Sequence, residues 1–295
     1  MEPSTEDSPE DRMRTLFAEL LLRLDLEPAG EDDFRGTSER DRHGRIYGGQ
    51  VVAQALVAAA RTAPGLAAHS LHAYFLRPGD PREPVLYRVE RIRDGRSFAT
   101  RRVSASQRGA AIFEMSASFH RPESGDEHHA PMPASPPPEA LPAPHVLVER
   151  VRDRVPEDCQ WALEPRAIEM RHLYVPTFLG GGPGDGPNHA WFRAPAPVPE
   201  EPLLHQCLLA YATDFTFNDN AIRRHGRGGR PGRPIMASLD HSIWFHEPTR
   251  IDQWLLFFQE SPRAGGGRGF VRGEIFTREG RHVASVAQET LLRRI

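Results

Sequence analysis

The 295-residue chain is long enough for one large or two moderate domains, and its net charge of −3 gives no bulk attraction toward nucleic acid. Every basic residue is arginine, which excludes Schiff-base lysine chemistry and a lysine-containing phosphate-binding loop. No apolar run approaches the roughly 20 residues that span a bilayer, and no signal-peptide pattern precedes the acidic N-terminus. Cys159 and Cys207 lack CxxC spacing, which is typical of a reduced compartment. We therefore expect a cytoplasmic enzyme or binding protein without membrane insertion.

The chain begins with an acidic, proline-bearing stretch, residues 1–11, which we expect to be disordered. An amphipathic helix is predicted next, because apolar residues recur at helical spacing between Met13 and Leu24. Phe34–Gly36 is a candidate first strand, and the residues from there to Arg45 read as a charged loop. This N-terminal region is expected to pack on the main body.

A largely apolar segment follows the Gly48-Gly49 pair. Val51, Leu56 and Ala59 recur at helical spacing with little besides alanine and valine between them. A helix that is apolar on nearly every side must be buried, and its small residues let a sheet approach closely. The next run, 69–76, alternates like a strand. A buried central helix followed by antiparallel strands is the plan of a hot-dog fold.

Turn-forming residues divide the following stretch into a meander of strands at 70–76, 85–93, 97–107 and 110–119. Between 121 and 144 the proline density rules out helix or sheet and indicates a linker. His128 and His129 in this linker resemble metal ligands, but no third ligand is near, so we interpret them as solvated and expect no metal site.

Beyond the linker the pattern of the first half returns. We predict a helix at 146–155, strands at 167–173 and 190–193, and a second apolar helix at 203–213 that ends at Asp214. A Gly/Arg/Pro loop at 226–234 precedes a second meander, 236–295.

The two meanders can be superposed on each other. Tyr74 falls on Trp244 at a constant offset that also relates Glu90 to Glu260, and an apolar helix precedes each meander. A duplication of this kind predicts two halves that pack together. We expect an α+β tandem (double) hot-dog, in which two repeats of central helix and long antiparallel sheet form one continuous sheet. Its parts are a repeat at 12–120, a linker at 121–145 and a repeat at 146–295.

The two halves differ at a position that bears on function. The first half has Ala117 where the second has Gln288, and alternation with Ala284 and Val286 places Gln288 on the covered face of its strand. A buried amide requires hydrogen-bond partners, which could be structural or functional. Asp214 raises the same question, because the dipole at a helix end disfavours an anion.

Several motifs in order resemble the acyl-CoA thioesterase II (TesB-like) family of double hot-dog thioesterases. The resemblance covers nearly the whole chain. Its motifs are FRG at Phe34–Gly36, YGGQVVAQAL at Tyr47–Leu56, HSLHAYFLRPGD at His69–Asp80, RDGRSFATRRV at Arg93–Val103, AYATDFTF at Ala210–Phe217, SLDHSIWFH at Ser238–His246, and RGFVRGEIFTREG with VASVAQE between Arg268 and Glu289.

The resemblance implies hydrolysis of acyl-CoA to a free acid and coenzyme A, without a cofactor, by a dimer or tetramer. It assigns the catalytic groups to Asp214, Ser238 and Gln288, where Ser238 replaces a threonine that is common in the family. The amide and hydroxyl would hold the attacking water while Asp214 acts as general base. For the carbonyl oxygen we expect backbone N–H donors at a helix start, with Gly49 and Gln50 as candidates.

Some alternatives remain open on the sequence. Asp240, beside Ser238 on the same face of the predicted strand, is a rival carboxylate. Four histidines and four arginines could be functional, as catalytic groups or phosphate ligands, or merely packing and surface groups: His69, His72, His241, His246, Arg77, Arg101, Arg102 and Arg272. Hydratase chemistry and non-catalytic acyl-CoA binding compete with hydrolysis. A serine hydrolase of the α/β type is disfavoured, because no G-x-S-x-G motif is present.

Overall fold

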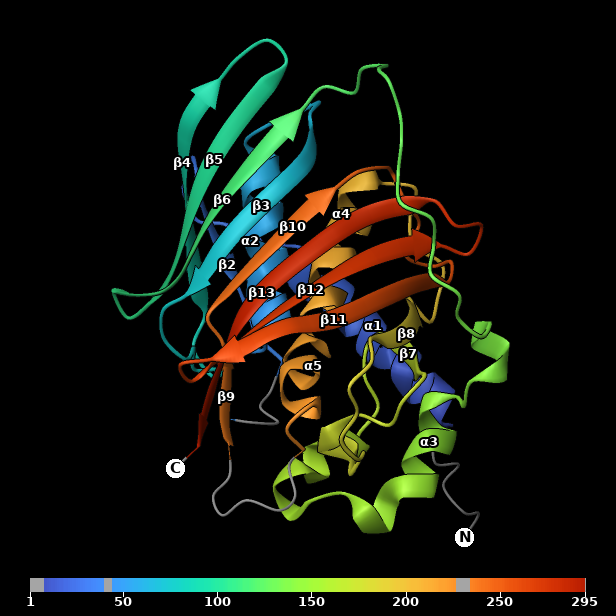
Figure 1. The fold of residues 1–295 in the computed structure, drawn as a ribbon. Coiled ribbons are helices and arrows are strands. Elements are labelled where there is room, and N and C mark those ends of the chain that lie inside the picture. The colour runs from blue at the N-terminus through green and yellow to red at the C-terminus, as the bar shows by residue number, and fades with distance from the viewer. Residues whose placement is uncertain (1–7, 40–43, 227–233, 295) are drawn as a thin grey trace, which may run out of the picture.

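The computed structural model describes residues 8–39, 44–226 and 234–294, in which a long curved sheet wraps around a layer of helices (Figure 1). Residues 1–7 of the predicted disordered terminus, residues 40–43 of the charged loop and residues 227–233 of the predicted Gly/Arg/Pro loop lie outside the described residues.

The first half contains the predicted buried helix and meander. Its elements are α1 (Pro9–Leu24), β1 (Glu27–Pro28), β2 (Asp33–Gly36), α2 (Gly48–Arg61), β3 (Ala67–Phe75), β4 (Val85–Asp94), β5 (Phe98–Gln107) and β6 (Ala110–His120). Every residue of α2 from Gly49 to Ala60 is buried, as the sequence predicts. Helix α1 begins earlier than expected, because Ser8 accepts a hydrogen bond from Asp11 N–H and caps it. Residues 9–11 are therefore helical rather than disordered.

The second half repeats this order with additions. Its elements are α3 (Pro144–Val151), β7 (Glu169–His172), β8 (Asn188–Arg193), α4 (Pro202–Thr213), α5 (Phe217–Arg223), β9 (Pro234–Ser238), β10 (Asp240–Phe245), β11 (Leu255–Gly265), β12 (Arg268–Thr277) and β13 (His282–Arg294). The sequence did not predict α5, since seven residues rich in Asn and Asp have weak helix propensity. Phe217, Ala221 and Ile222 hold it in place by burial.

The strands form one sheet in the order β1-β2-β4-β5-β6-β3-β10-β13-β12-β11-β8-β7, with β9 paired to β13. From the centre outward, β3-β6-β5-β4-β2 corresponds to β10-β13-β12-β11-β8. His72 of β3 lies opposite Ser242 of β10, 170 positions later, the offset that also relates Tyr74 to Trp244. A pseudo-twofold axis therefore passes through this central pair. The predicted continuous double hot-dog sheet is confirmed.

The proline-rich segment between the halves contains no helix or strand from 121 to 137 and runs along the second half of the sheet (Figure 1). It is anchored there, because Trp191 Nε1 donates to Pro136 O at 2.8 Å and Met132 packs near Trp254 and Phe276. The linker thus covers aromatic side chains on β8, on β12 and just before β11.

The prediction that prolines exclude helix as far as residue 144 is wrong at the end of the linker, where a 3-10 helix lies at Pro138–Ala140 and α3 begins at Pro144. Proline is tolerated at these first helical positions, because the N–H it lacks has no acceptor there.

Within the parts of the chain that the structure describes, no helix is both long and apolar enough to cross a bilayer.

Candidate active site

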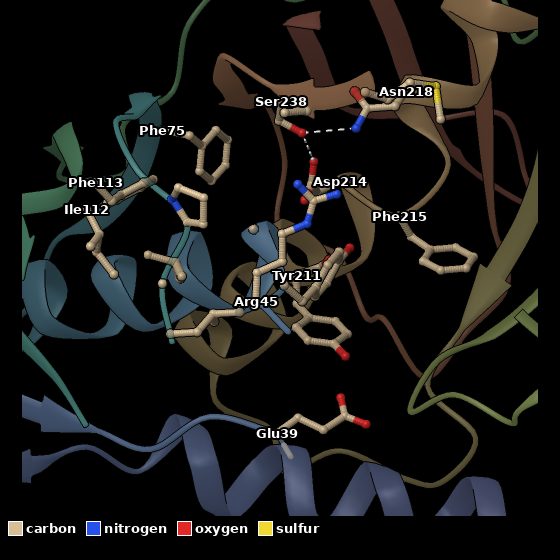
Figure 2. A pocket seen from close by; sticks show the side chains of 18 of the residues that line it. Glu39, Arg45, Phe75, Ile112, Phe113, Tyr211, Asp214, Phe215, Asn218 and Ser238 are labelled. Atoms are coloured by element: carbon tan, nitrogen blue, oxygen red, sulfur yellow. Dashed lines mark hydrogen bonds between the residues drawn. The ribbon is translucent and has the colours of Figure 1, made fainter. Parts of the chain in front are cut away.

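A pocket of about 530 Å³ lies between the two halves, and Figure 2 shows its interior. The first half contributes Gly48 at the start of α2 and an apolar wall that includes Phe75 and Phe113. The second half contributes polar side chains at one end, Asp214, Ser238 and Asn218, and aromatic ones elsewhere, Trp161, Phe178 and Phe215. An apolar cavity with a few convergent polar groups is the usual form of a small-molecule site.

Asp214 is placed by the ends of two helices. It caps the C-terminus of α4, where the α4 dipole is unfavourable, and it is only 7% exposed. The start of α2 compensates, since it lies so close that a Cβ on Gly48 would be 2.7 Å from Asp214 Oδ2. Tyr47, just before α2, donates to Tyr211 O of α4 at 2.8 Å and joins the two helix ends. The favourable dipole of α2 therefore faces the carboxylate that α4 presents.

Hydrogen bonds connect the three residues that the resemblance predicts. Ser238 Oγ donates to Asp214 Oδ1 at 3.0 Å and accepts from Gln288 Nε2 at 3.1 Å. Ser238 ends β9 just before a break at Leu239, whereas Gln288 lies on β13 and is 1% exposed. Residues 24 and 50 positions apart are thus brought into one chain of polar contacts at the pocket.

Asn218 of α5 is a fourth member of this set, and sequence reasoning missed it. Its Nδ2 donates to Ser238 Oγ at 3.2 Å and its Oδ1 accepts from Gln288 Nε2 at 2.8 Å. Figure 2 shows Asn218 and Asp214 directed toward Ser238 from different sides. No signal in the sequence identified Asn218, because the helix that carries it was not predicted.

His241 lies behind Gln288. Its side chain is fully buried, its Nδ1 contacts Gln288 Oε1, and its Nε2 is 2.9 Å from Thr213 Oγ1. Burial lowers the pKa of His241, although Asp214 and the Gln288 contact act to raise it. The sequence left His241 among the candidate packing groups, but its alternation with Ile243 and Phe245 already indicated an inward position.

The other predicted site positions are placed differently. Gly49 is the second residue of α2, and Gln50 N–H already donates to Tyr47 O at 3.1 Å. The Gln50 side chain binds the backbone of residues 37 and 39, whereas Gly48 faces the pocket. Asp240, the rival carboxylate, accepts from Glu289 N–H at 2.6 Å and does not line the pocket. Burial raises the pKa of Asp240.

The candidate arginines separate into three kinds. Arg77 lines the pocket, as do Arg45 and Arg166, and its guanidinium donates to Ala111 O at 2.7 Å. Arg101 is 1% exposed and binds Thr62 within the first half. The remaining two form surface ion pairs: Arg102 with Glu90 and Arg272 with Glu260. Arg101 is thus a structural residue and not a phosphate ligand.

Three of the candidate histidines face the outer side of the sheet and contact serines there. These pairs are His69 with Ser118, His72 with Ser242 and His246 with Ser285. In the described residues no group of three His, Cys, Asp or Glu side chains could hold a metal ion.

Two family models match the chain. "Acyl-CoA thioesterase N-terminal domain" matches residues 37–120, and "Acyl-CoA thioesterase" matches residues 165–291. The chain is 38% identical over 284 residues to "Acyl-CoA thioesterase 2" of Haemophilus influenzae, which covers 95% of this chain and 99% of that protein. The chain belongs to the acyl-CoA thioesterase family.

Further relatives support this assignment. Human "Acyl-coenzyme A thioesterase 8" is 39% identical over 297 residues, covering 97% of this chain and 92% of that protein. The structure of the acyl-CoA thioesterase II TesB2 from Mycobacterium marinum has a TM-score of 0.75 and 41% identity, covering 95% and 98% of the two chains. A hot-dog protein from Alicyclobacillus acidocaldarius, with a TM-score of 0.74 and 20% identity, shares the fold.

Membership of the acyl-CoA thioesterase family confirms that the protein is a thioester hydrolase of the TesB-like, double hot-dog class. The cytoplasmic location stays a prediction, because another relative, 25% identical over 304 residues, is the "Peroxisomal acyl-coenzyme A thioester hydrolase 1" of Saccharomyces cerevisiae.

Proposed function

We propose that this acyl-CoA thioesterase hydrolyses its substrate by direct attack of a water molecule that Asp214 activates as general base. The observation that carries the proposal is the contact of Ser238 Oγ with Asp214 Oδ1 at 3.0 Å, which orients the carboxylate at the end of an apolar pocket. A thioester is activated compared with an amide, so an oriented water and a carboxylate as general base suffice for its hydrolysis.

The reaction then proceeds in two steps without a covalent enzyme intermediate. The water oxygen forms a bond to the thioester carbon while one water proton passes to Asp214, and the carbonyl oxygen becomes an oxyanion. The carbonyl re-forms as the carbon–sulfur bond breaks, and the proton on Asp214 passes to the departing sulfur. The products are a carboxylic acid and coenzyme A, and Asp214 returns to its starting state.

The hydrogen bonds at Ser238 argue against this residue as the nucleophile. Its hydroxyl donates to Asp214 and accepts from both Gln288 and Asn218, so both lone pairs are engaged. An attacking oxygen needs a free lone pair directed at the carbonyl carbon. Ser238 and Gln288 therefore serve to orient the carboxylate and the water beside it.

Backbone N–H groups at the start of α2 are suited to stabilise the oxyanion. The first N–H groups of a helix lack intrahelical acceptors, and those of Gly48 and Gly49 belong to this class. Gly48 lies between Asp214 and Phe75 in the pocket. A carbonyl carbon placed near Asp214 would thus have its oxygen directed toward the positive end of α2. This assignment shifts the predicted donor pair from Gly49 and Gln50 to Gly48 and Gly49.

The pocket suits an acyl-CoA in its chemistry as well. Phe75, Phe113 and Ile112 offer an apolar surface to an acyl chain, whereas Arg45 and Arg77 are exposed cations at the pocket that could meet the phosphates of coenzyme A. The predicted dimer or tetramer remains part of this proposal.

The deciding experiment measures coenzyme A release with a thiol reagent over acyl-CoAs from short to long chain. We expect turnover by the wild type and a fall in kcat of roughly 10²–10⁴-fold in Asp214→Asn. Asp240→Asn is the matched control, because the new amide can still accept from Glu289 N–H, and we expect its turnover to stay near the wild-type value.

Other outcomes would redirect the assignment. Loss of turnover in Asp240→Asn alone would move the base to that carboxylate. If the wild type binds acyl-CoA of every length but releases no coenzyme A, hydrolysis at this site is refuted and a binding role is supported. Hydration of an enoyl-CoA without thiol release would instead support the hydratase alternative.

A further inference from the structure

The imidazole of His241 has no contact with the pocket, yet both of its nitrogens are engaged with residues that lead to it. Nδ1 contacts Gln288 Oε1 on β13, and Nε2 lies 2.9 Å from Thr213 Oγ1 at the end of α4. The ring of Phe217 from α5 packs edge-on at 6.1 Å between centroids. His241 is therefore enclosed by the same elements that carry the proposed catalytic residues.

Counting donors fixes the protonation of this ring. Gln288 Nε2 has two hydrogens, and they are directed to Asn218 Oδ1 at 2.8 Å and Ser238 Oγ at 3.1 Å. Gln288 Oε1 is left to accept, so Nδ1 of His241 must donate. Full burial favours the neutral ring, in which Nε2 then accepts from Thr213 Oγ1–H.

We propose that His241 is a positioning residue. It donates Nδ1–H to Gln288 Oε1 and so determines that the NH₂ group of the Gln288 amide, and not its oxygen, faces Ser238. The proposal rests on the proposed function, in which Ser238 orients Asp214. Its role is distinct from those of the three predicted groups, since His241 would act only through Gln288.

The consequence of losing this donor follows from the same contacts. The amide of Gln288 could then turn about its terminal bond and place Oε1 against Ser238 Oγ. The serine hydroxyl would have an alternative acceptor, and its proton could leave Asp214 Oδ1 for the amide oxygen. With the histidine in place, that orientation would set Nδ1–H against an NH₂ group, so it is disfavoured.

Thr213 connects the ring to the carboxylate-bearing helix end. Its hydroxyl lies 3.0 Å from Ala210 O and 2.9 Å from His241 Nε2, but it has one proton for these two acceptors. In the proposed Nδ1–H tautomer that proton is directed to Nε2 rather than to Ala210 O. Asp214 is the next residue along the chain, so the tautomer and the position of the carboxylate depend on the same turn of α4.

The tautomer can be measured without any assay of activity. ¹⁵N NMR of histidine-labelled wild-type protein, with the signal assigned through His241→Asn, should show His241 with a protonated Nδ1 and an unprotonated Nε2 at neutral pH. A ring protonated on Nε2 alone would refute the proposal, whatever the enzyme does with substrate.

The kinetic test compares two substitutions at the same position. His241→Leu removes the donor, and we expect kcat to fall roughly 10- to 100-fold with little change in KM. His241→Asn places an amide N–H₂ group near the position of Nδ1, so it should recover most of the lost kcat. His205→Leu is the matched control. His205 is also buried, but it lies on α4, and its Nδ1 accepts from Ile251 N–H. The kcat of this control variant should equal that of the wild type.

A double variant decides whether His241 acts through Gln288. In a Gln288→Ala background, His241→Leu should cause no further loss of kcat, because residues that act as a unit are not additive. Independent, additive losses would contradict the positioning role. If the wild type released no coenzyme A, the proposed function would fail while the tautomer measurement still tested the ring. If Asp214→Asn were inactive while the losses from His241→Leu and Gln288→Ala were additive, the proposed function would stand and only the role of His241 would be refuted.

Discussion

Three hydrogen bonds converge on one hydroxyl group in this thioesterase, that of Ser238, and its role follows from their direction. The proton is directed to Asp214, and the lone pairs accept from Gln288 and Asn218. A serine saturated in this way aligns a carboxylate but is poorly placed to attack a thioester. Threonine would satisfy the same contacts with a stiffer side chain.

Replacement of Ser238 therefore separates two mechanisms. We expect Ser238→Ala to lower kcat roughly 10- to 100-fold while leaving measurable hydrolysis, since Asp214 would still take the proton from water. Ser238→Thr should stay near the wild-type rate. Acid-quenched wild-type enzyme, sampled during turnover and weighed intact by mass spectrometry, should carry no acyl group. An acyl adduct on Ser238 would instead establish a covalent pathway.

At the scale of elements, the site is made by the meeting of the start of α2 and the end of α4. Neither helix end is sufficient by itself, because α4 supplies Asp214 against its own dipole and α2 supplies the compensating one. The approach is so close that residue 48 must lack a side chain. A Cβ there would lie 2.7 Å from Asp214 Oδ2 and 3.0 Å from Phe75.

Gly48→Ala is accordingly predicted to displace the carboxylate rather than unfold the protein. A shift of about 1 Å at a reacting group can cost about 10²-fold in rate, so we expect a fall of that order in kcat with the circular dichroism spectrum retained. Gly125→Ala in the linker is the matched control, since nothing lies within 4 Å of the added carbon. If the two variants had equal kcat values, the close approach of α2 to α4 would not be needed for turnover, and the prediction would be wrong.

Much of this arrangement could be predicted from the sequence, and the failures have physical reasons. The α2 and α4 helices and both meanders follow from periodicity and turn residues, because these elements are long and regular. Helix α5 and its Asn218 were missed, since tertiary burial of Phe217 outweighs weak propensity there. The contact of His241 with Gln288 joins two strands, and a pattern along one strand cannot show what lies on its neighbour.

For the whole molecule, histidines that lose hydration on folding determine how stability responds to acid. Loss of hydration is the largest cause that lowers the pKa of six histidines. Four of them are buried, His172, His189, His205 and His241, whereas His69 is half-buried and His246 is exposed. For His172 burial lowers the pKa to about 4 from an ordinary value of 6.5. Below that ordinary value the unfolded chain binds more protons than the folded one, so acid favours unfolding.

The free energy of unfolding should therefore fall as the pH decreases from about 6.5 toward 4. At pH 5 the contribution of His172 to this fall is about 2 kcal/mol, from the difference between its two pKa values. Urea unfolding at pH 7 and pH 5 measures it, and His172→Gln should lose less stability between the two pH values than the wild type does. Parallel losses in both proteins would show that His172 is not protonated on unfolding.

The pseudo-twofold axis through His72 and Ser242 relates the candidate active site to a position in the first half that structural side chains occupy. There Thr62 ends α2 as Asp214 ends α4, Ala117 replaces Gln288, and the guanidinium of Arg101 binds Thr62. In a homodimer of single hot-dog subunits every substitution appears in both subunits. A residue that blocks one active site would therefore block the symmetry-related site as well. Joining both copies in one polypeptide removes that constraint. Each half could then change without copying the change to the other. The proposed carboxylate, hydroxyl and amide accordingly all lie in the second half, while the first half keeps the helix start that faces them.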